Sequence, residues 1–255
     1  MYPLLFEDWP TTIRRQQVAL LRLLPAPERA GPILDCACGI GTQTLGLAQA
    51  GFAIEGSDIA AVAIDCARRE ALARGLAIDF RIDDLRELNT APLGTFGVTL
   101  ALDNALPHLE SDVDISTALS VMRDRLRPGG ILLVSVRDYG PLLLERLATL
   151  PPRFFGENGC RRIVHQVWDW IDERRYVVHQ FITRQLSDER WDSDHFVGHY
   201  RAVTPEEIAL LAERAGFQEV RVLPPSATGF YQPIIMGRQA GAFADAPITS
   251  AATVR

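Results

Sequence analysis

A chain of 255 residues with 47% hydrophobic residues and a mean hydropathy of +0.04 is long enough for one sizeable α/β domain with a substantial core. The formal charge of −6 argues against a nucleic-acid backbone as partner, because phosphate binding normally leaves a basic surface. All 26 residues counted as lysine or arginine are arginine, which excludes Schiff-base chemistry and the phosphate-binding lysine of P-loop proteins.

The sequence shows no sign of a membrane segment or a targeting signal. No apolar run approaches the roughly 20 residues that span a bilayer. The residues after Met1 lack the basic start and the long apolar stretch of a signal peptide. We therefore expect no membrane partner and a cytoplasmic location.

Strands and helices alternate over the first half of the chain. Helices are predicted over Thr11–Leu24, Thr42–Ala50, Ile59–Gly75 and Asp112–Leu126, and strands over Ile33–Cys36, Ala53–Ser57, Ala77–Ile82, Val98–Leu102 and Ile131–Arg137. Thr11 or Thr12 is expected to cap the first helix, and residues 127–130 are expected to form a turn. This alternation predicts an α/β fold with a doubly wound, mostly parallel sheet.

The pattern changes after the fifth strand. Residues 161–201 alternate in the manner of strands, and we expect residues 150–201 to form an antiparallel β insertion that acts as a lid. A helix start follows, with Thr204 as cap, Pro205 at the first helical position and Glu207 completing a capping box.

The end of the chain is expected to complete the sheet. The last helix is predicted to end at Gly216, and strands over Phe217–Leu223 and Phe230–Gly237 bring the sheet to seven strands. We expect one domain over residues 1–238 and a disordered tail over residues 239–255.

The first strand leads into a tight turn with two glycines, Gly39 and Gly41, and a helix opens at Thr42. The second strand is followed by an acid, Asp58. Glycines let the backbone approach a ligand, and a carboxylate at this place binds a ribose diol. Strand, turn, helix and acid in this order predict a pocket for an adenosine-bearing ligand.

The identity of that ligand depends on Thr44. A dinucleotide-binding fold has a third Gly or Ala at this position, beneath a pyrophosphate, so a nicotinamide oxidoreductase is disfavoured. S-adenosylmethionine has a ribose, an adenine, a sulfonium and an amino-acid end but no phosphate, and it needs no anion-binding turn.

From Ile33 to Arg137 the chain resembles class I S-adenosylmethionine-dependent methyltransferases. Four motifs carry the resemblance, in order: Asp35–Thr42, Ile54–Asp58, Asp83–Leu85 and Leu126–Gly130. The resemblance implies a Rossmann-like fold and S-adenosylmethionine as methyl donor.

The resemblance also implies a role for each residue of the cofactor site. Gly39 and Gly41 would pass beneath the cofactor, and Asp58 would accept hydrogen bonds from both ribose hydroxyls. The other predicted contacts are Ile59 on the adenine, Asp84 at the adenine amino group, Leu85 beside the adenine ring, and Asp35 near the ammonium of the amino-acid end.

The residues after the fourth and fifth strands are similar to the glycine and sarcosine N-methyltransferase group. The similar segments are Asp103–Leu109 and Val134–Tyr139. The resemblance implies that Asn104 and Arg137 lie beside the acceptor, with Arg137 binding its carboxylate. Asp103 stands where that group usually has Gly, and an acid there would favour an amine without a carboxylate. A salt bridge at the strand end remains the structural alternative for Arg137.

Aromatic and basic side chains around this position are further candidates. Trp168, Trp170, Tyr176, Tyr200 and Tyr231 either wall the acceptor site or pack the insertion against the sheet. His108, Tyr139 and His199 are candidate proton acceptors, although an amine needs no strong base.

Two groups of metal-binding residue types lack the arrangement of a metal site. Cys36 and Cys38 are separated by one residue and have no second pair, so they are interpreted as small buried thiols. His195 and His199 are four residues apart, but the residues between them are typical of a strand. We therefore expect no metal.

Taken together, these motifs predict methyl transfer from S-adenosylmethionine to a small molecule, with an amine nitrogen as the favoured acceptor. An O-methyltransferase is the nearest enzymatic alternative, and a buried base near His108 would favour it. A binding module without catalysis is the other alternative, and a blocked acceptor cavity would support it. Homo-oligomerisation is left open.

Overall fold

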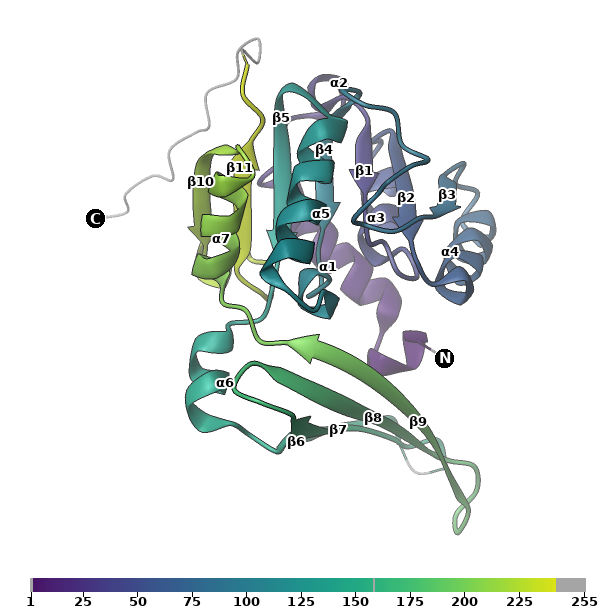
Figure 1. The fold of residues 1–255 in the computed structure, drawn as a ribbon. Coiled ribbons are helices and arrows are strands. Elements are labelled where there is room, and N and C mark those ends of the chain that lie inside the picture. The colour runs from purple at the N-terminus through teal and green to yellow at the C-terminus, as the bar shows by residue number, and fades with distance from the viewer. Residues whose placement is uncertain (1, 158, 242–255) are drawn as a thin grey trace, which may run out of the picture.

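The computed structural model describes residues 2–157 and 159–241, and its main feature is a seven-stranded sheet in the order β10–β11–β5–β4–β1–β2–β3 (Figure 1). The strands are β1 (Ile33–Asp35), β2 (Ile54–Asp58), β3 (Asp79–Ile82), β4 (Phe96–Ala101), β5 (Leu126–Ser135), β10 (Gln218–Leu223) and β11 (Ile234–Arg238). The first five strands pair in parallel, whereas β11 runs antiparallel to β5 and to β10. The predicted doubly wound, mostly parallel sheet is confirmed.

Helices cover both faces of this sheet. They are α1 (Trp9–Leu21), α2 (Pro27–Ala30), α3 (Thr42–Gln49), α4 (Ala61–Ala73), α5 (Asp112–Arg125), α6 (Tyr139–Glu145), α7 (Pro205–Arg214) and α8 (Pro225–Thr228), with 3-10 turns η1 (Tyr2–Leu5) and η2 (Leu106–His108). Because successive side chains of a strand point to opposite faces, Ile33 packs with Leu20 of α1 and Leu47 of α3. Its neighbour Leu34 lies in the other core layer, with α5 and α7.

The start of the first helix differs from the prediction. Asp8, not Thr11 or Thr12, is the N-cap, and its carboxylate accepts a hydrogen bond of 3.2 Å from the Thr11 N–H. Asp is as good a cap as Thr, and Pro10 fits the first turn because it has no N–H to leave unsatisfied. The helix therefore begins two residues earlier than predicted.

Residues 127–130, predicted as a turn, form the irregular beginning of β5. Phe96 pairs with Leu126 and Val98 with Ile131, so the chain bulges outward between these two pairs. Gly129 has φ +75°, a conformation that favours glycine. The turn-forming residues thus distort a strand instead of preceding it, because β4 provides a pairing partner on both sides of the bulge.

A separate four-stranded antiparallel sheet is inserted after β5 and α6, as the sequence predicts. It contains β6 (Thr149–Phe155), β7 (Arg162–Trp170), β8 (Arg175–Gln185) and β9 (Trp191–Arg201) in this order. Figure 1 shows it at one end of the large sheet, below it in the view. One face carries an apolar cluster, in which Trp168, Tyr176 and Val178 are buried with Tyr139 of α6.

The last elements follow the prediction closely. Thr204 and Glu207 form the predicted capping box of α7, and Gly216 follows that helix with φ +94°. Strand β11 begins at Ile234, later than the predicted Phe230. Most of the tail predicted to be disordered, residues 242–255, lies outside the described residues. Of the helices that the structure describes, none has the length and apolar character needed to cross a membrane.

Candidate active site

The predicted site residues come from the ends of four parallel strands. Asp35 and Asp58 are the last residues of β1 and β2, and Asn104 and Arg137 follow β4 and β5. The carboxyl ends of parallel strands lie at one edge of a sheet, so these four side chains gather at the same edge. Hydrogen bonds from this edge reach the small sheet through Tyr139, as described below.

The glycine turn after β1 leaves open space at one of its two glycines. Gly39 has φ +54°, and a Cβ built on it would meet no atom within 4 Å. Gly41 has φ +89°, but a Cβ there would touch Leu45 at 3.3 Å and Ala67 at 3.5 Å. Gly41 is thus required by the backbone and by helix packing, whereas Gly39 lines a space that a ligand can enter.

The carboxylate of Asp58 is held in place by backbone donors. Its Oδ2 accepts a hydrogen bond of 2.8 Å from the Gly39 N–H, and its Oδ1 accepts one of 2.9 Å from the Ala60 N–H. Each oxygen keeps a second lone pair for another donor. The next side chain, Ile59, is 66% exposed although it is apolar. An exposed apolar side chain beside an oriented carboxylate fits the ribose and the adenine of the predicted cofactor.

Asp35 is fully buried, and Thr44 is its partner. The Thr44 hydroxyl donates a hydrogen bond of 2.7 Å to Asp35 Oδ2. Burial raises the pKa of Asp35 from its ordinary 3.8 to about 7, against the opposing effect of this hydrogen bond. Thr44, the residue that argues against a dinucleotide, therefore donates a hydrogen bond to an acid that changes its charge near neutral pH.

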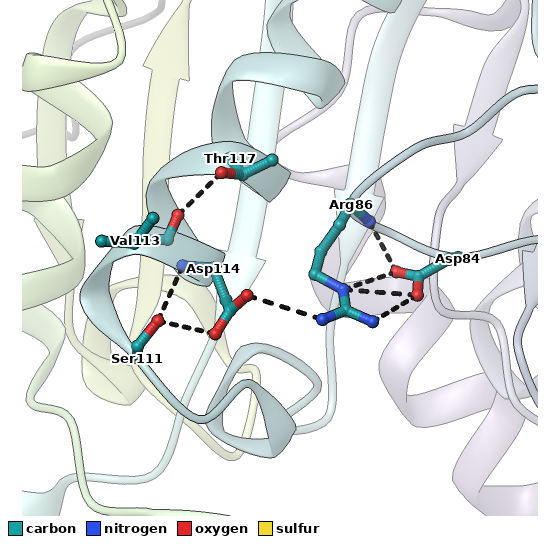
Figure 2. Close-up of polar contacts among 6 residues, drawn as sticks. All are labelled: Asp84, Arg86, Ser111, Val113, Asp114 and Thr117. Carbon is teal, nitrogen blue, oxygen red and sulfur yellow. Dashed lines mark hydrogen bonds and ion pairs between the residues drawn. The ribbon is translucent and has the colours of Figure 1, made fainter.

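Asp84 belongs to an ion-pair network that the sequence did not predict (Figure 2). The Arg86 guanidinium contacts Asp84 Oδ2 at 2.6 Å, and the Arg86 N–H donates to Asp84 Oδ1 at 2.8 Å. On its other side, Arg86 lies 3.5 Å from Asp114 in the first turn of α5. The bond to Arg86 lowers the pKa of Asp84. Leu85, between these two residues in sequence, is buried in the core layer beneath α5.

Asn104 connects the end of β4 to the small sheet. Its side-chain N–H donates to the Tyr139 hydroxyl at 2.9 Å, and that hydroxyl lies 2.8 Å from the Tyr176 hydroxyl of β8. Asn104 Oδ1 accepts a hydrogen bond of 3.0 Å from the Arg137 N–H. Asn104 has φ +70° and Asp103 has φ +55°, so two consecutive residues adopt a left-handed conformation. Such conformations are strained and cluster at functional sites.

The guanidinium of Arg137 lies over the buried Trp168, with its central carbon 5.0 Å from the ring centre. Its Nη1 is buried and has no hydrogen-bond partner within the described part of the chain. A buried guanidinium N–H without an acceptor is costly. The arrangement therefore leaves a donor ready for an anionic group of a ligand.

Aromatic rings continue from Trp168 along the inner face of the small sheet. Trp168 stacks on Tyr176 at 4.6 Å, Tyr176 on Tyr200 at 5.6 Å, and Tyr200 lies 4.1 Å from the ring of His108. Burial raises the pKa of Tyr139, and desolvation lowers that of His108. Tyr139 therefore keeps its proton at neutral pH, and the shift at His108 favours its uncharged form although the residue is exposed at the surface.

The acid that stands in place of the usual glycine, Asp103, is held by three neutral donors. Gln43 donates to it at 2.7 Å, Tyr231 at 2.9 Å and Gln16 at 3.4 Å. Burial raises the pKa of Asp103. Sequence reasoning missed Gln16 and Gln43 because they lie on α1 and α3, and no local pattern links them to β4.

The histidines considered as metal ligands lie on β9, as the strand-like pattern indicates. His195 Nε2 lies 2.9 Å from His179 Nδ1. Within residues 2–157 and 159–241, no three His, Cys, Asp or Glu side chains are placed to hold a metal ion. The four cysteines are free thiols, with Cys36 and Cys38 buried.

Comparison with known proteins agrees with this geometry. Residues 33–130 match the family model described as a methyltransferase domain, over the same strands and glycine turn that form the site. The chain contains a methyltransferase domain and is an S-adenosylmethionine-dependent methyltransferase. S-adenosylmethionine is its methyl donor, and the open space at Gly39 and the oriented Asp58 carboxylate fit that cofactor.

Several curated proteins are similar to this methyltransferase. A putative methyltransferase, YqeM of Bacillus subtilis, is 28% identical over 77% of this chain and 76% of its own length. The ubiquinone biosynthesis O-methyltransferase of Xanthomonas axonopodis is 28% identical over half of each chain. The glycine/sarcosine N-methyltransferase of Halorhodospira halochloris is 30% identical over 53% of this chain and 50% of its own. The chain thus spans about half the length of these two methyltransferases.

Among solved structures, the fold is similar to CalS10, an amino pentose methyltransferase from Micromonospora echinaspora. The TM-score is 0.72, the identity is 21%, and 94% of each chain is covered. The aligned residues include the small sheet as well as the large one. At 21% identity, this similarity shows a shared fold and no more.

Proposed function

We propose that the enzyme methylates a nitrogen atom of a small molecule that carries an anionic group, as an amino acid does. The observation that supports this proposal is the buried, unpartnered Nη1 of Arg137 over Trp168. A guanidinium fork matches the geometry of a carboxylate. The glycine/sarcosine N-methyltransferases among the relatives are consistent with such an acceptor.

We assign the cofactor site to the residues at the carboxyl ends of β1, β2 and β3. Asp58 binds the ribose diol, Ile59 packs on the adenine, Asp84 and Leu85 lie at the far side of the adenine, and Asp35 faces the ammonium end. Gly39 lets the backbone approach closely. When bound, S-adenosylmethionine supplies a methyl group on a positively charged sulfur.

The residues at the ends of β4 and β5 then orient the acceptor. Arg137 binds the anionic group, and Asn104, whose amide is fixed by Tyr139 and by the Arg137 N–H, offers its remaining oxygen lone pair to an N–H of the acceptor. Alignment of nucleophile and methyl group is the main requirement of this reaction. An amine releases its proton to water or to the uncharged His108. Tyr139, whose hydroxyl is engaged on both sides, positions Asn104.

The small sheet acts in this proposal as the wall that excludes water. Its rings, above all Tyr176 and Tyr200, present faces that stabilise a positively charged nitrogen. An O-methyltransferase is the second candidate, because the lowered pKa of His108 suits a general base and a relative methylates oxygen in ubiquinone biosynthesis.

A methyl-transfer screen tests the proposal. S-adenosylhomocysteine release is measured over amino acids, simple amines and phenols, with the wild-type enzyme and the Arg137→Ala variant. We expect amino acids or related anionic amines to be methylated, and Arg137→Ala to raise the KM at least about tenfold for these acceptors alone. Methylation of phenols only, with no effect of Arg137→Ala, would show that the acceptor atom is oxygen.

A further inference from the structure

Two more arginines share the inner face of the small sheet with the aromatic rings. Phe155 pairs with Arg162 and Arg153 with Val164 across β6 and β7. By the alternation of a strand, Arg153 and Arg162 therefore point to the same side as Trp168, over which Arg137 lies. Among the ion pairs formed by residues 2–157 and 159–241, none includes Arg137, Arg153 or Arg162.

The two side chains lie close to each other. Their guanidinium carbons are 5.8 Å (Arg153) and 5.0 Å (Arg162) from the centre of the same ring, Phe155. Arg162 donates to the Phe6 carbonyl at 2.6 Å, while its Nε is buried without a partner. Burial lowers the pKa of Arg153, and repulsion from Arg137 and Arg162 lowers it further. The three positive charges therefore interact with one another.

Such a gathering of like charges is unfavourable in the absence of an anion. Like charges near a protein surface repel one another, and the repulsion strengthens where burial lowers the effective dielectric constant. The charge of Glu7 acts on Arg162, but among the described residues no acid forms an ion pair with Arg137, Arg153 or Arg162. The net charge of −6 argues against a nucleic-acid polymer as this anion. A small anion with several oxygens suits two guanidinium groups better than a single carboxylate does.

We propose that the acceptor of this enzyme carries a phosphoryl group, which Arg153 and Arg162 bind on the inner face of the small sheet. The backbone N–H of Arg137 is bonded to Asn104, and its guanidinium lies over Trp168. This inference rests on the proposed function, and it narrows the acceptor to a phosphorylated amine.

Binding of inorganic pyrophosphate to the S-adenosylhomocysteine complex is the first test. By calorimetry, we expect Arg153→Gln and Arg162→Gln each to weaken pyrophosphate binding at least tenfold. Arg190→Gln is the matched control, since it removes the same charge from the exposed β8–β9 connection. Melting temperatures and S-adenosylhomocysteine affinity identify variants that fail to fold. Absence of pyrophosphate binding, or equal binding by all four proteins, overturns the proposal.

Paired acceptors separate a phosphorylated substrate from free phosphate. The pairs are serine with O-phosphoserine and glucosamine with glucosamine 6-phosphate. We expect a higher kcat/KM for the phosphorylated member, and loss of that preference in Arg153→Gln but not in Arg190→Gln. Pyrophosphate binding without any preference for phosphorylated acceptors overturns the acceptor assignment. Methylation confined to phenols contradicts the proposed function instead, and the two failures are therefore distinguishable.

Discussion

Thr44 donates its hydroxyl hydrogen bond to the buried carboxylate of Asp35 at 2.7 Å, and this pair joins α3 to the end of β1. The pKa of Asp35 is raised to about 7 by burial, so the unfolded chain releases this proton at lower pH than the folded protein does. Between the two pKa values the folded state binds more protons. Protonation of Asp35 therefore stabilises the folded state at low pH. This stabilisation is lost as the pH rises from about 4 to about 7, by at most about 1.4 kcal/mol per pH unit.

The pH dependence of cofactor binding tests the assignment of Asp35. A cationic ammonium favours the ionised carboxylate, so S-adenosylhomocysteine affinity should increase as the pH rises from about 5 to about 7, by up to about tenfold per unit, and then level off. Asp35→Asn should remove this dependence and flatten the fall in melting temperature over the same range. A wild-type affinity that does not change with pH would contradict the assignment.

The ribose assignment is tested at Asp58. Asp58→Ala removes an acceptor of two charge-assisted hydrogen bonds, and we expect it to weaken S-adenosylhomocysteine binding by about tenfold or more in calorimetry. Asp65→Ala is the matched control, because Asp65 is an exposed acid on the adjacent helix α4. Since Asp58 also accepts from Gly39 and Ala60, the melting temperature of each variant is needed for comparison. Unchanged affinity in Asp58→Ala would rule out the ribose contact.

Arg86 should act as a positioning residue for the adenine contact. Its guanidinium holds Asp84 on one side and approaches Asp114 on the other (Figure 2). Arg86→Gln should lower S-adenosylhomocysteine affinity several-fold. It should lower affinity much less for an analogue without the 6-amino group, because Asp84 has no donor to bind there.

A merely structural role of Arg86 predicts an equal loss for both ligands. The exposed Arg69→Gln on α4 is the control for the loss of charge, and it should leave both affinities unchanged.

Two substitutions at Asn104 distinguish the role of its side-chain amide from the effect of its left-handed backbone conformation. Asn104→Gly keeps φ +70° accessible but removes the amide and its hydrogen bonds to Tyr139 and to the Arg137 backbone N–H, so we expect a loss of stability of about 1–3 kcal/mol and a kcat/KM at least about tenfold lower. Asn104→Ala should show the same loss of activity and be about 1 kcal/mol less stable than Asn104→Gly, because alanine is strained in the left-handed region. Chemical denaturation and initial rates measure the two effects.

Tyr139→Phe provides a second comparison for the same segment. It removes the hydroxyl that fixes the Asn104 amide but keeps the buried ring. We expect kcat to fall and the affinity for S-adenosylhomocysteine to stay unchanged. Full activity in Tyr139→Phe would mean that the amide needs no support from the small sheet.

The sequence by itself determined the class of protein and the order of its main elements. The glycine turn and Asp58 could be predicted because their conformation depends on neighbours in the chain: a glycine where φ is positive, and an acid where a strand ends. The capping box at Thr204 and Glu207 is local in the same way. Element ends were less accurate, as at Asp8 and at residues 127–130, since several residues there are equally good caps or strand members.

Only the tertiary structure decided which side chains meet at the acceptor end. Arg153 and Arg162 lie on strands of the small sheet, Gln43 lies on a helix of the large one, and Arg137 follows β5. Their proximity depends on strand register and on how the two sheets pack. A one-residue shift in register would turn Arg162 to the opposite face. The proposed donor site is therefore predictable from local sequence, whereas the proposed acceptor site depends on contacts between residues far apart in the chain.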